Sequence, residues 1–229
     1  MSVHNGHRQR MRQRFLKHGL DNFEDHELLE ILLYYCVPRY DTNVIAHRLV
    51  DRFGSLFQVI DAPIHELEKV EGVGPNIATF LSLIKATHKR LGIAKVRQNA
   101  MMETIDQYAE YLKNLFMGIH NEAAYLMCLD AKRMLIDCCL ISEGSVSTVN
   151  VSARKVVEIA LNTKATTVIL AHNHPGGLAI PSEDDLQTTK MLAHALYLTG
   201  VVLVDHVILT ENSFVSMRRS KMFDFEQLW

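Results

Sequence analysis

The sequence predicts a small all-α domain over residues 1–98, followed by an α/β domain over residues 103–229. Three observations predict this division. Apolar residues recur at helical spacing in the first part, and short β-branched runs alternate with helical segments in the second. The charge also changes: residues 1–100 carry 14 Lys and Arg against 11 Asp and Glu, a net +3, whereas the rest carry 10 against 15, a net −5. A chain of 229 residues is long enough for two domains.

The composition is that of a folded protein, with 48% hydrophobic and 22% charged residues, and it argues against a disordered chain. No apolar run reaches the roughly 18 residues that span a bilayer, and residues 1–20 are basic and polar, unlike a signal peptide. We therefore expect a cytoplasmic protein without membrane contact. The four cysteines show no C-x-x-C spacing, so we expect reduced thiols that serve as packing residues.

Three helices are predicted early in the first part. Residues 22–36 carry a broad apolar stripe and acidic residues near their start, which the helix dipole favours. Asp41 or Thr42 caps a second helix, which Gly54 ends. Pro63 suits the first turn of a short helix that runs to Leu67. Short helices joined by tight turns predict a small bundle.

The turn Gly72-Val73-Gly74, followed by Pro75, resembles a helix-hairpin-helix motif. In that motif, backbone N–H groups of the turn and of the next helix hold a nucleic-acid phosphate without reading the base sequence. The resemblance implies a weak, sequence-independent DNA contact through Gly72, Val73 and Gly74. The alternative is a purely structural turn or a protein contact, because three glutamates surround the turn: Glu66, Glu68 and Glu71.

The second part is predicted to follow a polar linker over residues 95–102. Its helices and strands follow from the change of hydrophobic period along the chain. We expect helices over 104–115, 152–161 and 183–198, and strands over 124–129, 134–141, 166–171, 201–209 and 213–216. The strand over 166–171 is almost continuously apolar, which is typical of a central strand buried on both faces.

A candidate metal site follows that central strand. Because alternate residues of an extended segment share a face, His172 and His174 can direct two imidazoles at one point. Pro175 ends the strand, and the chain returns so that Asp185, in the first turn of the next helix, can supply an oxygen. Two histidines and one carboxylate with a fourth position left open are typical of a catalytic zinc site.

The run from His172 to Asp185, H-x-H-P-x6-S-x2-D, is the JAMM signature, and the chain resembles the JAB/MPN metalloprotease superfamily. The H-N-H-P-x-G form, the later pair Asp205-His206 and the helical domain in front resemble the bacterial RadC family over nearly the whole chain. The resemblance implies a cytidine-deaminase-like mixed sheet flanked by helices. His206 with Asp205 is expected either to support a metal ligand or to be a buried histidine bound to a backbone carbonyl.

The resemblance also implies roles for individual residues. His172, His174 and Asp185 become the ligands of one Zn²⁺ per chain, and Ser182 donates a hydrogen bond to the attacking water or the oxyanion. A glutamate at the start of the first strand is the general base. Glu122 fits that place, and Glu143, expected in a turn after a strand, is the second candidate.

The expected reaction is hydrolysis of an amide or isopeptide bond in a protein or peptide substrate. Zinc lowers the pKa of water to roughly 7 and polarises the carbonyl under attack. A glutamate then takes the proton of the water and returns it to the leaving amine. The rival hypothesis is a DNA-associated protein of the RadC type whose metal site is structural or inactive.

Overall fold

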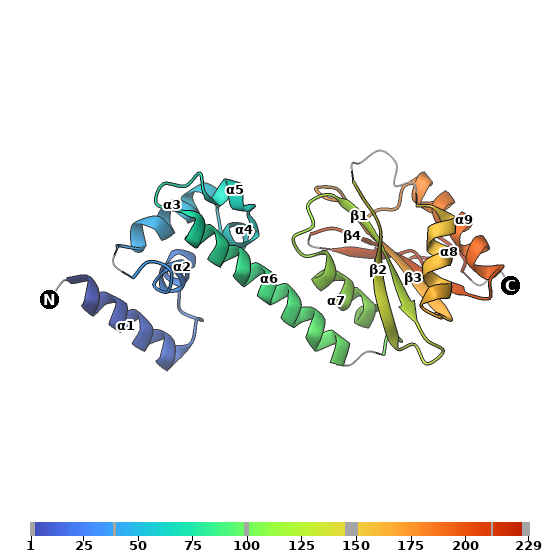
Figure 1. Ribbon diagram of the computed structural model, residues 1–229, viewed down its shortest axis with the longest axis horizontal. Helices are drawn as coiled ribbons and strands as arrows, with labels where there is room; N and C mark the ends of the chain where they lie inside the picture. Colours follow the sequence, from blue (N-terminus) through green and yellow to red (C-terminus); the bar gives the residue numbers. More distant parts are fainter. Residues whose placement is uncertain (1–2, 39, 99–100, 145–150, 212, 226–229) are drawn as a thin grey trace. The chain divides into compact units, whose positions relative to one another are not determined.

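The computed structural model of the protein describes residues 3–38, 40–98, 101–144, 151–211 and 213–225 (Figure 1). The chain separates into two compact units, residues 1–88 and residues 89–229. The division falls inside the long helix α6 (Pro75–Gln98), whereas the sequence placed the domain boundary at residues 98–103. The linker prediction is wrong for residues 95–98, which continue this helix, and residues 99–100 lie outside the described part. Among the described helices, none is long and apolar enough to cross a membrane.

The first unit is entirely helical, as expected. Its helices are α1 (Val3–His18), α2 (Asp25–Leu33), α3 (Asn43–Phe53), α4 (Leu56–Asp61), α5 (Ile64–Leu67) and the first part of α6. The predicted ends of α3 are confirmed, since Thr42 is its N-cap and Gly54, with φ of 93°, its C-cap. Buried side chains of α2 to α6, among them Leu29, Leu49 and Leu81, form its apolar core.

The helix α1 was not predicted, because its sequence is polar and lacks an apolar stripe. Its own arginine side chains hold it in place through contacts with residues outside the helix. The Arg8 guanidinium donates hydrogen bonds to the backbone carbonyls of Val37, Pro38 and Tyr40, which follow α2. The Arg14 guanidinium makes a bidentate contact with the Glu27 carboxylate on α2. Long-range polar contacts thus contribute stability to α1 that its local hydrophobic pattern does not predict.

The turn between α5 and α6 requires Gly72. Its φ of 92° lies in the left-handed region, and a Cβ atom at this position would lie 3.1 Å from Cγ1 of Ile45 on α3. Val73 follows as a buried apolar plug, 6% exposed. Gly74 immediately precedes α6, and its carbonyl accepts from the N–H groups of Ile77 and Ala78. The two glycines therefore differ, since a Cβ on Gly74 meets no atom within 4 Å.

The second unit has a five-stranded mixed sheet in the order β2-β1-β3-β4-β5, which confirms the predicted α/β class. The strands are β1 (Glu122–Leu129), β2 (Leu135–Gly144), β3 (Thr167–Asn173), β4 (Val202–Leu209) and β5 (Phe214–Ser216). β3 and β4 are parallel, and the other neighbouring strands are antiparallel. Helix α7 (Ile105–Phe116) covers one face, and α8 (Ala153–Asn162) and α9 (Glu183–Tyr197) cover the other (Figure 1).

Side chains of β3 divide between these two faces with the alternation of a strand. Val168 and Leu170 point into the core under α8 and α9, whereas Ile169 and Ala171 point toward α7. All residues from Val168 to Asn173 are buried, so the prediction of a central strand covered on both faces is confirmed. The pattern places the next even-numbered residue, His172, on the α8 and α9 face.

The hairpin of β1 and β2 is longer than predicted. Glu122 is already in β1, and β2 continues to Gly144, so Glu143 lies inside a strand opposite Ala123 rather than in a turn. The placement of Glu143 after the strand is therefore wrong. The register shifts between Ala124 and Tyr125, which places an extra residue in β2, and the Lys155 ammonium of α8 donates to the backbone carbonyl of Ile141 at this irregularity.

The α7 face is tied together by a buried carboxylate. Asp205 on β4 is fully buried and accepts hydrogen bonds from the Tyr108 hydroxyl of α7 at 2.6 Å and the Ser216 hydroxyl of β5 at 2.5 Å. The backbone N–H groups of His206 and Arg218 donate to its other oxygen at 2.8 and 3.0 Å. Burial raises the pKa of Asp205, although these four donors oppose that effect. The bonds link α7, β4 and β5.

Replacing Gly72 by alanine is expected to destabilise the helical unit by about 2–4 kcal/mol, because it adds left-handed strain and a clash with Ile45. Gly74→Ala, two residues away, is the matched control and should cost about 0.5 kcal/mol as an N-cap change. Native-state hydrogen exchange of the α3 and α6 amides measures both effects. Equal protection in the two variants would contradict this account of the turn.

Candidate metal centre

Three side chains that the sequence singled out converge at the end of β3. The Nε2 atoms of His172 and His174 are 2.8 Å apart. The Asp185 carboxylate of α9 lies 3.2 Å from the first through Oδ1 and 3.7 Å from the second through Oδ2. Their potential ligand atoms all lie within 4.8 Å of one another. In the described part of the chain, no other group of three His, Cys, Asp or Glu side chains comes together in this way.

The spacing of these atoms fits a small divalent ion. Ligands about 2.0–2.2 Å from a tetrahedral zinc ion lie roughly 3.3–3.6 Å from one another. The three separations in the cluster, 2.8, 3.2 and 3.7 Å, lie around that range. Imidazole nitrogen and carboxylate oxygen are donors that Zn²⁺ binds, and two histidines with one carboxylate are a known catalytic set. The residues present therefore fit zinc.

The loop after β3 fixes the orientation of His174. Its Nδ1 lies 3.1 Å from the backbone carbonyl of Leu178. Because a carbonyl only accepts, Nδ1 carries the proton and donates it, which leaves Nε2 of the neutral ring with a lone pair directed at Asp185 and His172. Gly176 favours this tight return, since its φ of 69° lies in the left-handed region that side chains disfavour.

Asp185 is held by the N-terminal cap of α9. The Ser182 hydroxyl accepts from the backbone N–H of Asp185 at 3.1 Å, and the Asp185 Oδ2 accepts from the Ser182 backbone N–H at 2.7 Å, a complete capping box. The Ser182 hydroxyl also donates to Oδ2 at 2.7 Å. Its single proton therefore serves the carboxylate in this structure, and the predicted bond to water or oxyanion stays a prediction.

His206 on β4 lies directly behind His172. Its Nε2 is 2.8 Å from Nδ1 of His172, and its Nδ1 is 2.6 Å from the Thr189 hydroxyl of α9. Of the two expectations for His206, contact with a predicted metal ligand is the one that the structure shows. Asp205 takes no part in this contact, because its carboxylate serves the α7 face. Burial lowers the pKa of His172, and lowers that of the fully buried His206 well below its usual value. The two ring contacts of His206 are a histidine nitrogen and a hydroxyl, so its ring has no carboxylate beside it that would stabilise a buried positive charge.

The two candidate bases lie on opposite faces of the sheet. Ala124 pairs with His172, so the even-numbered residues at this end of β1, Glu122 included, share the face of the metal cluster. Glu143 pairs with Ala123, whose side chain belongs to the core under α7. Consistent with this, Glu143 contributes to raising the pKa of Tyr125, although burial of the Tyr125 phenol has the larger effect.

Two supporting residues escaped the sequence analysis. Asn173, between the histidines, accepts from the backbone N–H of Ala123 through Oδ1 at 2.7 Å and donates to the carbonyl of Asn121 at 3.0 Å, which fixes the start of β1 next to the end of β3. Thr189 follows Asp185 by four residues and so shares its side of α9. That spacing from Asp185 was the signal in the sequence that could have singled out Thr189. Its contact with His206 could not be foreseen, because it depends on the pairing of β4 with β3.

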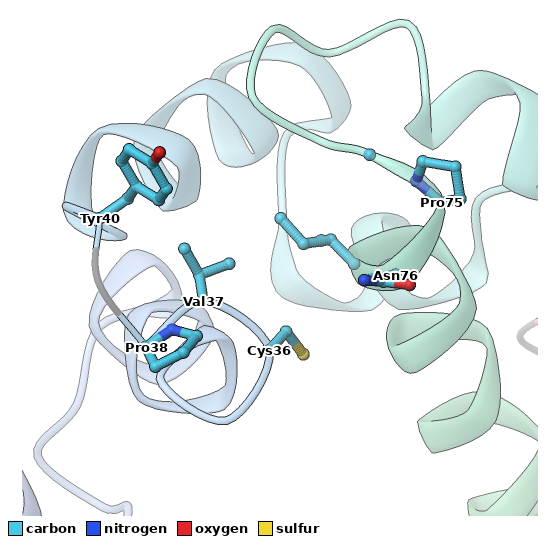
Figure 2. A pocket seen from close by; sticks show the side chains of 8 residues that line it. Cys36, Val37, Pro38, Tyr40, Pro75 and Asn76 are labelled. Atoms are coloured by element: carbon cyan, nitrogen blue, oxygen red, sulfur yellow. The ribbon is translucent and has the colours of Figure 1, made fainter.

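The turn with the predicted DNA contacts lies in the helical unit. Next to it, residues 36–38 and Tyr40, which follow α2, and the start of α6 line a hollow of about 540 Å³ (Figure 2). Pro38, Tyr40, Pro75 and Asn76 line it, and none of its described lining residues carries a formal charge. The nearby Arg48 is paired with the Glu71 carboxylate at 3.0 Å. Among the described residues around the hollow, little positive charge is therefore available for a phosphate.

Comparison with known proteins identifies the family. A family model described as RadC-like JAB domain matches residues 102–222, and one described as UPF0758 N-terminal matches residues 5–79. A UPF0758 protein of Fusobacterium nucleatum is 34% identical over 218 residues, which cover 92% of this chain and 94% of the relative. A UPF0758 protein of Ruegeria pomeroyi is 34% identical over 212 residues, 93% of this chain and 95% of the relative. The chain therefore belongs to the family of RadC-like JAB-domain proteins that carry the UPF0758 N-terminal region.

Proposed function

We propose that the protein is a zinc-dependent hydrolase of amide or isopeptide bonds in protein or peptide substrates. His172, His174 and Asp185 hold the zinc ion, and Glu122 is the general base. The observation that carries the proposal is the convergence of these three ligand atoms at separations of 2.8, 3.2 and 3.7 Å. Membership in the JAB family is compatible with this chemistry.

A three-ligand set favours catalysis over a structural role. Structural zinc sites are normally closed by four protein ligands, whereas catalytic sites keep one position for water or substrate. Among the described residues, the cluster has three members that can bind a metal ion. His174 and Asp185 are also partly exposed, which leaves an approach from solvent. A substrate carbonyl could therefore reach the open side of the site.

Glu122 is the better placed of the two glutamates. The register of β1 with β3 ends at the pair Ala124 and His172, and Glu122 lies two residues before Ala124 on the same face of the strand. Glu122 is half-buried at the end of the strand, a position in which its carboxylate can face both solvent and the site. Glu143, on the opposite face, would have to reach through the sheet.

When bound, zinc supplies a Lewis acid that polarises a carbonyl and lowers the pKa of water to roughly 7. The residues of the chain supply the rest. The Glu122 carboxylate takes a proton from the attacking water and passes it to the amine nitrogen as the C–N bond breaks. Ser182 keeps the Asp185 carboxylate oriented through the capping box. The Leu178 carbonyl keeps the His174 ring oriented.

Purified protein loaded with zinc and freed of excess metal is expected to hold about one zinc per chain, as an open three-ligand site predicts. His174→Ala should lose it, because two ligands remain. His194→Ala, which removes an exposed histidine on the same helix as Asp185, is the matched control and should retain the metal. Elemental analysis measures the ratio, and an unchanged zinc content in His174→Ala would overturn the proposed site.

Glu122→Gln should keep zinc but lose about 10²–10⁴-fold in turnover, the usual contribution of a general base. Glu143→Gln is the control from the other face of the sheet and should remain active. Both are measured with a peptide and isopeptide library, screened with and without a zinc chelator to identify the cleaved bond. An active Glu122→Gln together with an inactive Glu143→Gln would transfer the role to Glu143.

The DNA contact through Gly72, Val73 and Gly74 stays a prediction. The lack of charge among the described lining residues of the hollow and the Arg48–Glu71 pair argue against strong binding. Any affinity for duplex DNA should be equal for two unrelated sequences. It should also fall with salt, with a log–log slope of about −1 to −3, because few phosphates are contacted. Fluorescence anisotropy across a salt series measures this. Sequence-selective binding that ignores salt would contradict the predicted contact.

A further inference from the structure

Behind the candidate metal ligands, a row of polar side chains connects His172 to the backbone of α9. The atoms in order are Nδ1 of His172, the two ring nitrogens of His206, the Thr189 hydroxyl and the Asp185 carbonyl. The three successive separations are 2.8, 2.6 and 2.6 Å. His206 and Thr189 are both buried, 1% and 0% exposed. Neither residue is a proposed metal ligand or the proposed general base.

The direction of each hydrogen bond follows from the last acceptor. The backbone carbonyl of Asp185 can only accept, and at 2.6 Å the Thr189 hydroxyl must direct its single proton there. The Met217 sulfur, 3.6 Å from the same hydroxyl, is a more distant and weaker acceptor. Having used its proton, the hydroxyl can only accept from His206, so Nδ1 of His206 carries a hydrogen.

The same reasoning then assigns the ring protons of the two histidines. A neutral His206 with its proton on Nδ1 has a lone pair on Nε2, which accepts from Nδ1 of His172. His172 is thereby protonated on Nδ1, and its Nε2 lone pair is free toward His174 and Asp185. Along the three contacts of this row, any other arrangement of neutral rings places two protons or two lone pairs against each other. At the front of the cluster, the Nε2 atoms of His172 and His174, 2.8 Å apart, both present lone pairs, an arrangement that a bound cation would stabilise.

We infer that Thr189 and His206 are positioning residues that fix the tautomer and the direction of the ligand His172. The inference rests on the proposed function only for the identity of the metal. The chain of bonds begins at the backbone of Asp185, so the segment that supplies one ligand also orients another. Neighbours that hold a metal-binding histidine in this way typically change metal affinity by about 10–100-fold when removed.

The test uses full-length protein and two readouts. Thr189→Val keeps the shape of the side chain but removes the acceptor for the His206 N–H, and it should weaken zinc binding about 10–100-fold in a chelator competition. Thr189→Ser keeps the hydroxyl and should stay within about 3-fold of the original protein, a bound set by the retained hydrogen bonds. Thr163→Val is the matched control, since Thr163 makes the same hydroxyl-to-carbonyl bond, 2.8 Å to Ile159, on α8.

The second readout is the tautomer itself, measured without metal. Long-range ¹H–¹⁵N NMR of the metal-free protein, with His172 assigned by comparison with His172→Gln, should show its proton on Nδ1. This measurement needs no active enzyme and no variant of Thr189, so it decides the inference even if Thr189→Val fails to fold.

A His172 protonated on Nε2 in the metal-free protein would overturn the inference. So would a folded Thr189→Val that keeps its zinc affinity and the His172 tautomer. If the original protein binds no zinc at all, the proposed function fails, whereas the tautomer result still supports or overturns the positioning role of Thr189 and His206. The two failures are therefore distinguishable.

Discussion

The burial of β3 between two apolar layers is the constraint on which the candidate site depends. Val168 and Leu170 fill the core under α8 and α9, and Ile169 and Ala171 fill the core under α7. A slip of one residue against its neighbours would exchange these two sets and turn His172 to the α7 face. The apolar residues of the strand thus fix the direction of the histidine that follows them. The position of His172 in the cluster is therefore a consequence of the packed core.

Asp205 and His206, adjacent residues of β4, show how one strand contributes both to the packing of the α7 face and to the metal cluster. The Asp205 side chain faces α7, where the Tyr108 and Ser216 hydroxyls and two backbone N–H groups satisfy its carboxylate. The His206 side chain faces α9 and contacts His172 and Thr189. A buried carboxylate without partners would cost several kcal/mol, so the four donors make this position tolerable and tie α7 to the sheet. The pair therefore couples the stability of the sheet to the geometry of the site.

Local patterns in the sequence predicted most of the elements and the three candidate ligands. Capping residues such as Ser152 and Ser182 do mark the starts of helices, because their preference is a local property. The helix α1 was missed because contacts from Arg8 to distant carbonyls hold it in place. Thr189 was missed because it is one polar residue in a partly exposed helix until β4 places His206 against it. Glu143 was misplaced since the length of β2 depends on its pairing with β1.

The three candidate ligands are held in place by other parts of the protein, and this suits the cluster to bind a metal ion. Asp185 lies in the first turn of α9, where the capping box with Ser182 holds the carboxylate and the dipole of a 15-residue helix stabilises its negative charge. His174 is held from a loop carbonyl and His172 from inside the core. Each ligand is thus oriented by a different hydrogen-bond partner before any metal arrives. A site organised in this way loses little conformational entropy on binding, and it can leave one side open without losing its shape.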